Sequence, residues 1–133
     1  MKQMIWKDEY LTGVEEIDHQ HKDFVKLINR LNIIQGYGDN AGYALRIMSE
    51  VGKYFDYHFT SEENLMNITN YPQLETQEKS HKALLLRYRQ WMESYKSHKA
   101  DIEDVIKYLE SWFAGHTINE DKKIGKFLAK NKL

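Results

Sequence analysis

Two pairs of polar residues in this sequence have the spacing of ligands that share one binding site. His58 and Glu62 are four residues apart, and Gln77 and His81 have the same separation. On a helix this separation rotates the second side chain by only about 40°, so both members of a pair lie on one face. Imidazole nitrogens, carboxylate oxygens and amide oxygens all bind metal cations. The pairs are therefore either parts of a metal site or ordinary polar residues of helix surfaces.

Four amphipathic segments are expected to position these pairs. Apolar residues recur in each segment at intervals of three and four, which predicts helices that bury one face. Short connections between them favour an all-α, up-down-up-down antiparallel four-helix bundle with an N-terminal arm, in a single domain over residues 1–133. We expect the helices to run from an N-cap at Asp18 to about 36–38, from Asp39 to about Met66, from about Pro72 to about Tyr95, and from Asp101 to about His116, followed by one or two helical turns in the basic tail at 122–133.

Polar residues interrupt the apolar rows of all four predicted helices. His21 lies near the start of the first helix, whereas His58 and Glu62 lie near the end of the second. His81 lies early in the third helix, and His116 ends the fourth. In an antiparallel bundle these places are at the same end, so the sequence predicts four histidines and a glutamate at one level of the core.

A buried Glu62 needs a compensating charge at this level. Burying an ionised carboxylate without a partner costs roughly several kcal/mol or more. The neighbouring positions of the apolar rows hold no lysine or arginine that could neutralise it. A bound cation is the simplest compensation, and imidazole and carboxylate ligands without thiolate suit iron, manganese or zinc. One core histidine is usually hydrogen-bonded within the core, but four at one level favour a metal site. His19 and His98 are expected at the surface, since His19 points about 200° away from the row of His21.

The composition argues against several classes of function. The formal net charge is -1, and charges of both signs are mixed along the 133 residues. The sequence has no basic block that would suggest nucleic-acid binding and no apolar stretch long enough for a membrane span. It contains no cysteine, and its N-terminus lacks an apolar signal-peptide core, so we expect a cytoplasmic protein.

Nearly the whole chain resembles the hemerythrins, in particular the single-domain bacterial ones. The matching parts are Trp6 in the arm, GVEEIDHQH at 13–21, HFTSEENLM at 58–66, QEKSH at 77–81 and WFAGHTINED at 112–121. The resemblance implies a non-haem di-iron site, with Fe2+/Fe3+ and an oxo or hydroxo bridge, that binds molecular oxygen or another small diatomic molecule or peroxide. It implies that His21 and His58 hold one iron, that His81, His116 and a third nitrogen ligand hold the other, and that Glu62 and Asp121 bridge the two.

Asp121 fits this site only if the fourth helix is irregular. It follows His116 by five residues, which is about 140° of rotation on a regular helix. Both side chains reach one site if the helix ends, loosens or bulges between them. Gly115 and Thr117 make this region a suitable place for such an irregularity.

The sequence departs from the family pattern at two positions. Gln77 occupies the place of a histidine ligand, and its amide oxygen is a weaker donor to iron than an imidazole nitrogen. We therefore expect one normal iron position and one that is weak or empty, with Glu78 as an alternative ligand. Thr117 occupies a place that is often aliphatic, so it would add a hydroxyl to the oxygen pocket. The expected apolar wall of that pocket consists of Phe24, Phe59, Trp112 and Phe113.

Three functions remain open at this point. The first is reversible oxygen binding for carriage, storage or delivery, without enzymatic turnover. The second is a peroxidase- or oxidase-like enzyme, in which an open position on the weakened iron lets peroxide or another oxidant react. The third is a bundle with one metal or none, used for iron storage, sensing or protein contact, with oxygen binding impaired by Gln77.

Overall fold

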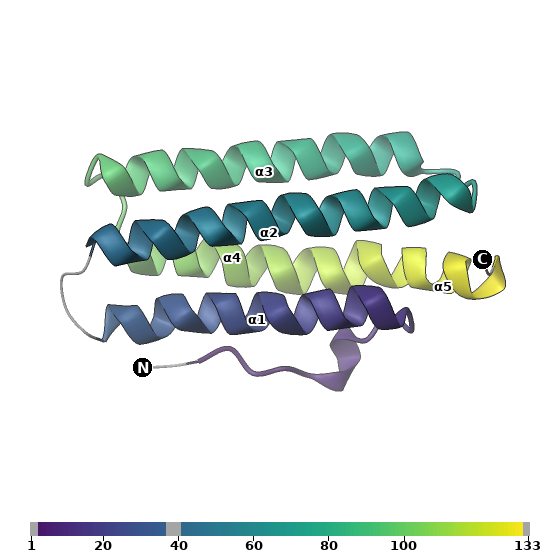
Figure 1. Ribbon diagram of the computed structural model, residues 1–133, viewed down its shortest axis with the longest axis horizontal. Coiled ribbons are helices and arrows are strands. Elements are labelled where there is room, and N and C mark those ends of the chain that lie inside the picture. The colour runs from purple at the N-terminus through teal and green to yellow at the C-terminus, as the bar shows by residue number, and fades with distance from the viewer. Residues whose placement is uncertain (1–2, 37–40, 132–133) are drawn as a thin grey trace.

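The computed structural model describes residues 3–36 and 41–131, and its regular elements there are helical. Long helices lie side by side, and successive helices run in opposite directions, which confirms the predicted up-down-up-down bundle (Figure 1). The last helix continues the line of the fourth. The elements are a short 3-10 helix η1 (Asp8–Tyr10), α1 (Glu15–Gln35), α2 (Ala41–Ile68), α3 (Leu74–Lys96), α4 (Ile102–His116), a π-helical turn η2 (Thr117–Asp121) and α5 (Lys122–Lys130).

The start of α1 differs from the prediction. The helix begins at Glu15 with Val14 as its N-cap, so the assignment of Asp18 as the N-cap is wrong. Asp18 is buried in the first turns of α1, and its carboxylate accepts hydrogen bonds from Thr12 N at 2.7 Å, Thr12 Oγ1 at 2.8 Å and Gly13 N at 3.2 Å. Gly13 has a φ of 89°, a conformation that glycine adopts without steric cost. Asp18 therefore fixes the turn that joins the arm to the bundle.

The other helix ends lie close to the expected places. Asp101 caps α4 as predicted, in a capping box with Asp104. The third helix begins at Leu74 rather than at Pro72, because Tyr71 O accepts a hydrogen bond from Leu74 N and leaves Pro72 in the second position of a turn. The expected boundaries at 37–39 lie outside the described residues. The basic tail forms the nine-residue α5, about two and a half turns, which is slightly longer than the one or two turns predicted.

The buried apolar residues form two separate clusters. The large apolar cluster fills most of the bundle and includes Phe24, Leu31, Met48, Phe55, Tyr88, Leu109 and Phe113. The smaller one, here called the end cluster, contains Ile17, Met66, Tyr71, Ile124 and Leu128. Leu65, predicted in a core row, is only half-buried, and its neighbour Met66 takes the core position.

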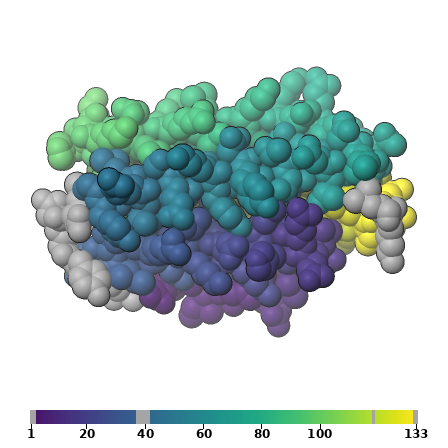
Figure 2. Space-filling view, viewed as in Figure 1, coloured from purple at the N-terminus to yellow at the C-terminus, as the bar shows by residue number. Residues whose placement is uncertain are grey.

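The arm and α5 both pack against the bundle, and they meet where Gly125 faces Thr12. Figure 2 shows the arm lying along one edge of the molecule and α5 reaching the surface at one end. Tyr10 of the arm is buried, and its ring meets Phe113 edge-on at 5.1 Å between centroids. A side chain at Gly125 would collide with the carbonyl oxygen of Thr12, so α5 and the arm approach each other closely. Within the described residues, no helix is apolar over a length that could cross a bilayer.

Candidate metal centre

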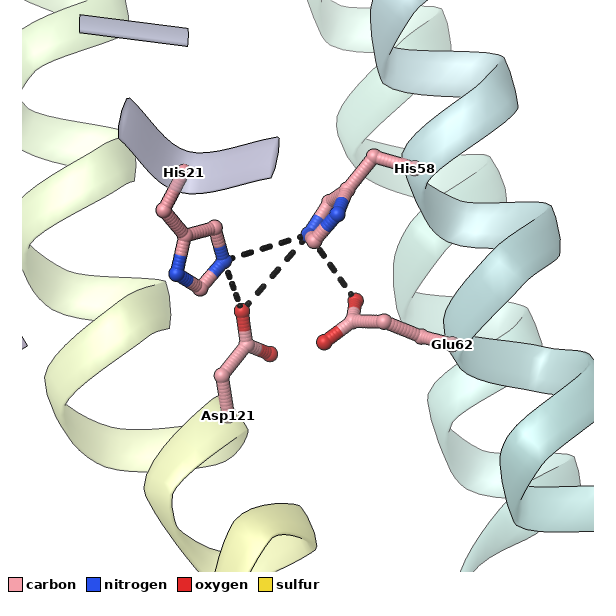
Figure 3. Close-up of side chains that lie close together, drawn as sticks. All are labelled: His21, His58, Glu62 and Asp121. Carbon is pink, nitrogen blue, oxygen red and sulfur yellow. Dashed lines mark hydrogen bonds and ion pairs between the residues drawn. The ribbon is translucent and has the colours of Figure 1, made fainter. Parts of the chain in front are cut away.

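The predicted polar residues meet at one level of the bundle, between the two apolar clusters. All of these residues are buried, and Glu62 and Asp121 have no exposed surface at all. Figure 3 shows the side chains from α1, α2 and the end of η2 pointing toward one another. The polar layer, as we call it below, comprises His21, His58, Glu62, His81, His116 and Asp121.

One half of the polar layer lies between α1 and α2. The Nε2 atom of His21 is 2.8 Å from Asp121 Oδ2, and that of His58 is 3.2 Å from Glu62 Oε1. The two Nε2 atoms are 3.3 Å apart. Potential ligand atoms of all four residues lie within 4.8 Å of one another, which is close enough for them to bind one ion.

The other half lies beside α3 and α4 and shares Glu62 with the first. Glu62 Oε1 is 3.5 Å from Nε2 of His81 and 4.0 Å from Nε2 of His116. Asp121 contributes its second oxygen, Oδ1, which is 3.0 Å from His116 Nε2. Both carboxylates therefore lie between the two sets of histidines, which is the placement that a bridging ligand requires.

The predicted irregularity of the fourth helix is a π-helical turn. It spans Thr117–Asp121 and follows directly after His116. Its wider turn pairs residues five apart instead of four. His116 and Asp121, which a regular helix would separate by about 140°, consequently face the same centre.

Two of the histidines are held in place from outside the polar layer. His58 Nδ1 donates a hydrogen bond to Gln20 Oε1 at 2.7 Å, and His81 Nδ1 donates to Glu63 Oε2 at 2.7 Å. These bonds turn the Nε2 atom of each ring toward the centre. Hydrogen bonds of this kind commonly orient imidazoles that bind metals.

Gln77 has the same arrangement with an amide in place of the imidazole. It is buried in α3, and its Nε2 donates a hydrogen bond to Glu120 Oε2 at 2.9 Å. Its Oε1 is buried and has no hydrogen-bond partner. Glu78, the predicted alternative ligand, is half-buried and belongs to neither group of potential metal ligands.

The sequence reasoning missed the three residues that provide these outer hydrogen bonds. Each of them is next in sequence to a predicted ligand of its own helix, and its hydrogen bond goes to a predicted ligand of a different helix. One residue of a helix is rotated by about 100° from the next, so the neighbour of a core ligand points toward an adjacent helix. This adjacency is the signal that identifies them: Gln20 precedes His21, Glu63 follows Glu62, and Glu120 precedes Asp121.

The protonation of the metal-free centre follows from burial and from the two carboxylates. Burial lowers the pKa of His58, but Glu62 and Asp121 outweigh it and raise that pKa to about 9. Burial likewise opposes the charged form of His116, and the same carboxylates raise its pKa to about 10. For His81 burial prevails, and the pKa lies below its usual value. Although burial opposes it, the pKa of Asp121 is well below its usual range because of His116, His21 and His58. Protons on His58 and His116 thus partly balance the carboxylates.

The buried atoms that lack hydrogen bonds test whether the residues fit a metal centre. A buried polar atom without a partner costs about 1–3 kcal/mol, so several at one place call for a missing partner. Carboxylate and imidazole atoms converge here, as two cations would need. Glu62 Oε2 and Gln77 Oε1 have no hydrogen bond. Glu62 Oε1, both oxygens of Asp121 and the Nε2 atoms of His81 and His116 have only ion-pair contacts within the histidine and carboxylate set. The residues present therefore fit a pair of metal ions.

The residues predicted to line an oxygen pocket are all buried at or near this level. Phe59 stacks on the ring of His81 at 4.0 Å, and Trp112 stacks on that of His116 at 5.2 Å between centroids. Phe113 meets the ring of His21 edge-on at 5.5 Å. Phe24 lies one layer further away, against Trp112 and Phe113. Thr117 is fully buried, and its Oγ1 has no hydrogen-bond partner. Their role as an oxygen pocket stays a prediction.

Comparison with known proteins gives one consistent result. Residues 12–128 match the model of the hemerythrin HHE cation binding domain. The bacteriohemerythrin of Pseudomonas aeruginosa is 31% identical over 122 residues, which cover 91% of this chain and 78% of that protein. The myohemerythrin of Theromyzon tessulatum is 25% identical over 119 residues, covering 89% and 88%. A crystal structure of wild-type hemerythrin superposes with a TM-score of 0.85 at 22% identity, covering 96% of this chain and 99% of that one, which supports the fold.

Proposed function

Because this chain belongs to the hemerythrin family of oxygen-binding non-haem iron proteins, we propose that it binds O2 reversibly at two iron ions and serves to carry, store or deliver it. The observation that carries the proposal is the buried polar layer, in which two sets of ligands share Glu62. A single ion would leave one of these sets without a cation. The family consists of oxygen-binding or sensing proteins rather than enzymes, which sets aside the peroxidase- or oxidase-like alternative.

We assign the ligands from the two halves of the polar layer. His21 and His58 would hold one iron, and His81 and His116 would hold the other together with Gln77. Glu62 and Asp121 would bind both ions, since each lies between the two sets of histidines. Bound iron supplies the electrons and the exchangeable coordination position that reversible oxygen binding needs.

The protein's own residues keep this centre ordered and dry. Gln20 and Glu63 fix the rings of His58 and His81, so little rearrangement accompanies metal binding. Phe59, Trp112 and Phe113 cover the imidazoles with apolar surface. Excluding water limits hydrolysis and loss of bound oxygen species. The hydroxyl of Thr117, which follows His116 directly in the sequence, is buried without a hydrogen-bond partner and would make the pocket more polar.

Anaerobic loading with Fe2+ tests the proposal directly. We expect two iron ions per chain, and a visible absorption change on exposure to O2 that reverses when O2 is removed. The Glu62→Ala variant should lose both metal positions, because it lacks the shared ligand. One ion or none in the unaltered protein, or two ions without an oxygen-dependent spectrum, would overturn oxygen binding and favour storage or sensing.

A further inference from the structure

We propose that Glu120 is a positioning residue that turns the amide oxygen of Gln77 toward the second metal position. This inference rests on the proposed function, since it concerns the iron held by His81 and His116. It starts from one contact: the amide nitrogen of Gln77 lies 2.9 Å from Glu120 Oε2, while the amide oxygen is buried without a partner.

The chemistry of the two groups fixes the direction of the amide. A carboxylate only accepts hydrogen bonds, so Glu120 selects the NH2 group of Gln77 and excludes its oxygen from the contact. The amide oxygen must then point away from Glu120. Gln77 is 4% exposed, so this oxygen cannot turn to bulk water without opening the packing around it. A cation is a partner that satisfies it.

The neighbouring ligand of the same helix shows an equivalent arrangement. His81 donates a hydrogen bond to Glu63, whose side chain is 27% exposed, and leaves its Nε2 free toward the centre. Gln77 donates to Glu120, whose side chain is 37% exposed, and leaves its Oε1 free. In both cases a carboxylate at the edge of the core holds the donor atom, and the acceptor atom of the same side chain is buried without a hydrogen bond. Glu120 also lies 3.9 Å from Lys123, at the surface.

The two metal positions are consequently unequal. The position of His21 and His58 has imidazole nitrogens and carboxylate oxygens, whereas that of His81 and His116 gains a neutral amide oxygen. Such an oxygen binds divalent first-row metals more weakly than an imidazole nitrogen does. Binding at the second position should depend on the contact between Gln77 and Glu120, and binding at the first should not.

Anaerobic titration with Co2+ tests this without relying on oxygen binding. Ligand-field absorption and calorimetry together report the affinity of each binding step. We expect two unequal steps in the unaltered protein. Glu120→Ala should weaken only the weaker step, by about 10- to 100-fold, the usual effect of losing an orienting hydrogen bond. Glu120→Gln keeps an acceptor oxygen and should restore most of that loss. Gln77→His should strengthen the same step by at least about 10-fold.

Glu78→Ala is the matched control, because it removes a carboxylate next to Gln77 that does not hold the amide. It should leave both steps unchanged. Two Co2+ steps that Glu120→Ala leaves intact, or weakens equally, would overturn the role of Glu120 while the proposed metal centre stands. If the unaltered protein binds no second Co2+, both the inference and the two-metal centre fail. Circular dichroism of each variant checks the fold, and Glu120 is exposed enough for its variants to keep it.

Discussion

The large apolar cluster and the end cluster share α1 and α2, but they differ in their other elements, since α3 and α4 complete the first cluster and α5 completes the second. The large cluster draws on α1, α2, α3 and α4 and on the arm. Among the described residues, the end cluster holds five buried ones, and the polar layer separates it from the large cluster. Predicted ligands lie at the border between the two regions: Ile17 lies one turn before His21, Met66 one turn after Glu62, and Ile124 one turn after Asp121. The half-buried Leu74, which packs against the end cluster, lies one turn before Gln77.

This difference shows where stability depends on a bound ion. The large cluster is held by apolar contacts that need no ligand. In the end cluster, the neighbours on the inner side are polar atoms, many of which lack hydrogen bonds. The end cluster should therefore open more easily in the metal-free protein, and a bound cation should join the two regions.

The largest effect is expected from truncating the large cluster. Leu109→Ala should lower the free energy of unfolding by about 2–5 kcal/mol, because the side chain is fully buried and leaves a cavity. Met66→Ala removes an equally buried side chain from the end cluster. Its cost in the metal-free protein should be smaller, because it cannot exceed the free energy that opens the end cluster. Urea unfolding in the presence of a chelator measures both values.

The metal-loaded protein is the control for this pair of variants. A bound cation makes opening of the end cluster harder, so the cost of Met66→Ala should rise toward that of Leu109→Ala. Equal costs for the two variants in the metal-free protein would show that the polar layer does not separate the regions.

The second effect comes from the metal itself. In the metal-free protein, amides of α5 should exchange with solvent faster than those of α1 beside Leu31. Free metal at 100 times its Kd should stabilise the closed end by about 2.7 kcal/mol per site, which slows exchange in α5 by about 100-fold for each occupied site. Hydrogen exchange followed by mass spectrometry or NMR gives both rates. The Glu62→Ala variant should show no slowing, and strong protection of α5 without metal would contradict the comparison.

The fold and most of the polar layer followed from the sequence because each depends on a periodic pattern. Spacings of three and four define the buried faces of the helices, and the histidines interrupt those same faces. The irregularity before Asp121 was expected only because the family resemblance placed Asp121 in the same site as His116, since two residues five apart share a face only outside a regular helix. Its form as a π-helical turn was not, because a bulge or a helix end would have served equally well.

The missed residues are those whose partners are distant in the sequence. Gln20 and His58 are 38 residues apart, and Gln77 and Glu120 are 43 residues apart. Sequence periodicity shows which side of its own helix a residue occupies, but not which neighbour it meets across an interface. The assignment of Asp18 as the N-cap was wrong for a related reason. An aspartate before an apolar row is typical of an N-cap, but here the arm folds back and its backbone supplies the donors for Asp18.

The smallest effect, counted per proton and per pH unit, is expected from pH. Raising the pH should lower the stability of the metal-free protein and increase the stability gained from metal. In the metal-free fold, His58 and His116 have pKa values of about 9 and about 10, above the value of about 6.5 expected when unfolded. A raised pKa stabilises the fold fully below about pH 6.5, and this contribution is lost as pH rises through 9 and 10. His81, whose pKa is lowered, loses its proton at or below the ordinary pKa of about 6.5 in both states, so it adds little slope above pH 7. Metal-free stability should therefore fall from pH 7 to 8.5 in urea unfolding, by at most about 1.4 kcal/mol per pH unit for each proton.

A cation takes the Nε2 atoms only by displacing those protons, so the stability gained from metal should rise over the same range. Metal addition in weak buffer at pH 7 should release protons, and binding without release, or metal-free stability that rises with pH, would show that carboxylates do not hold the imidazoles charged.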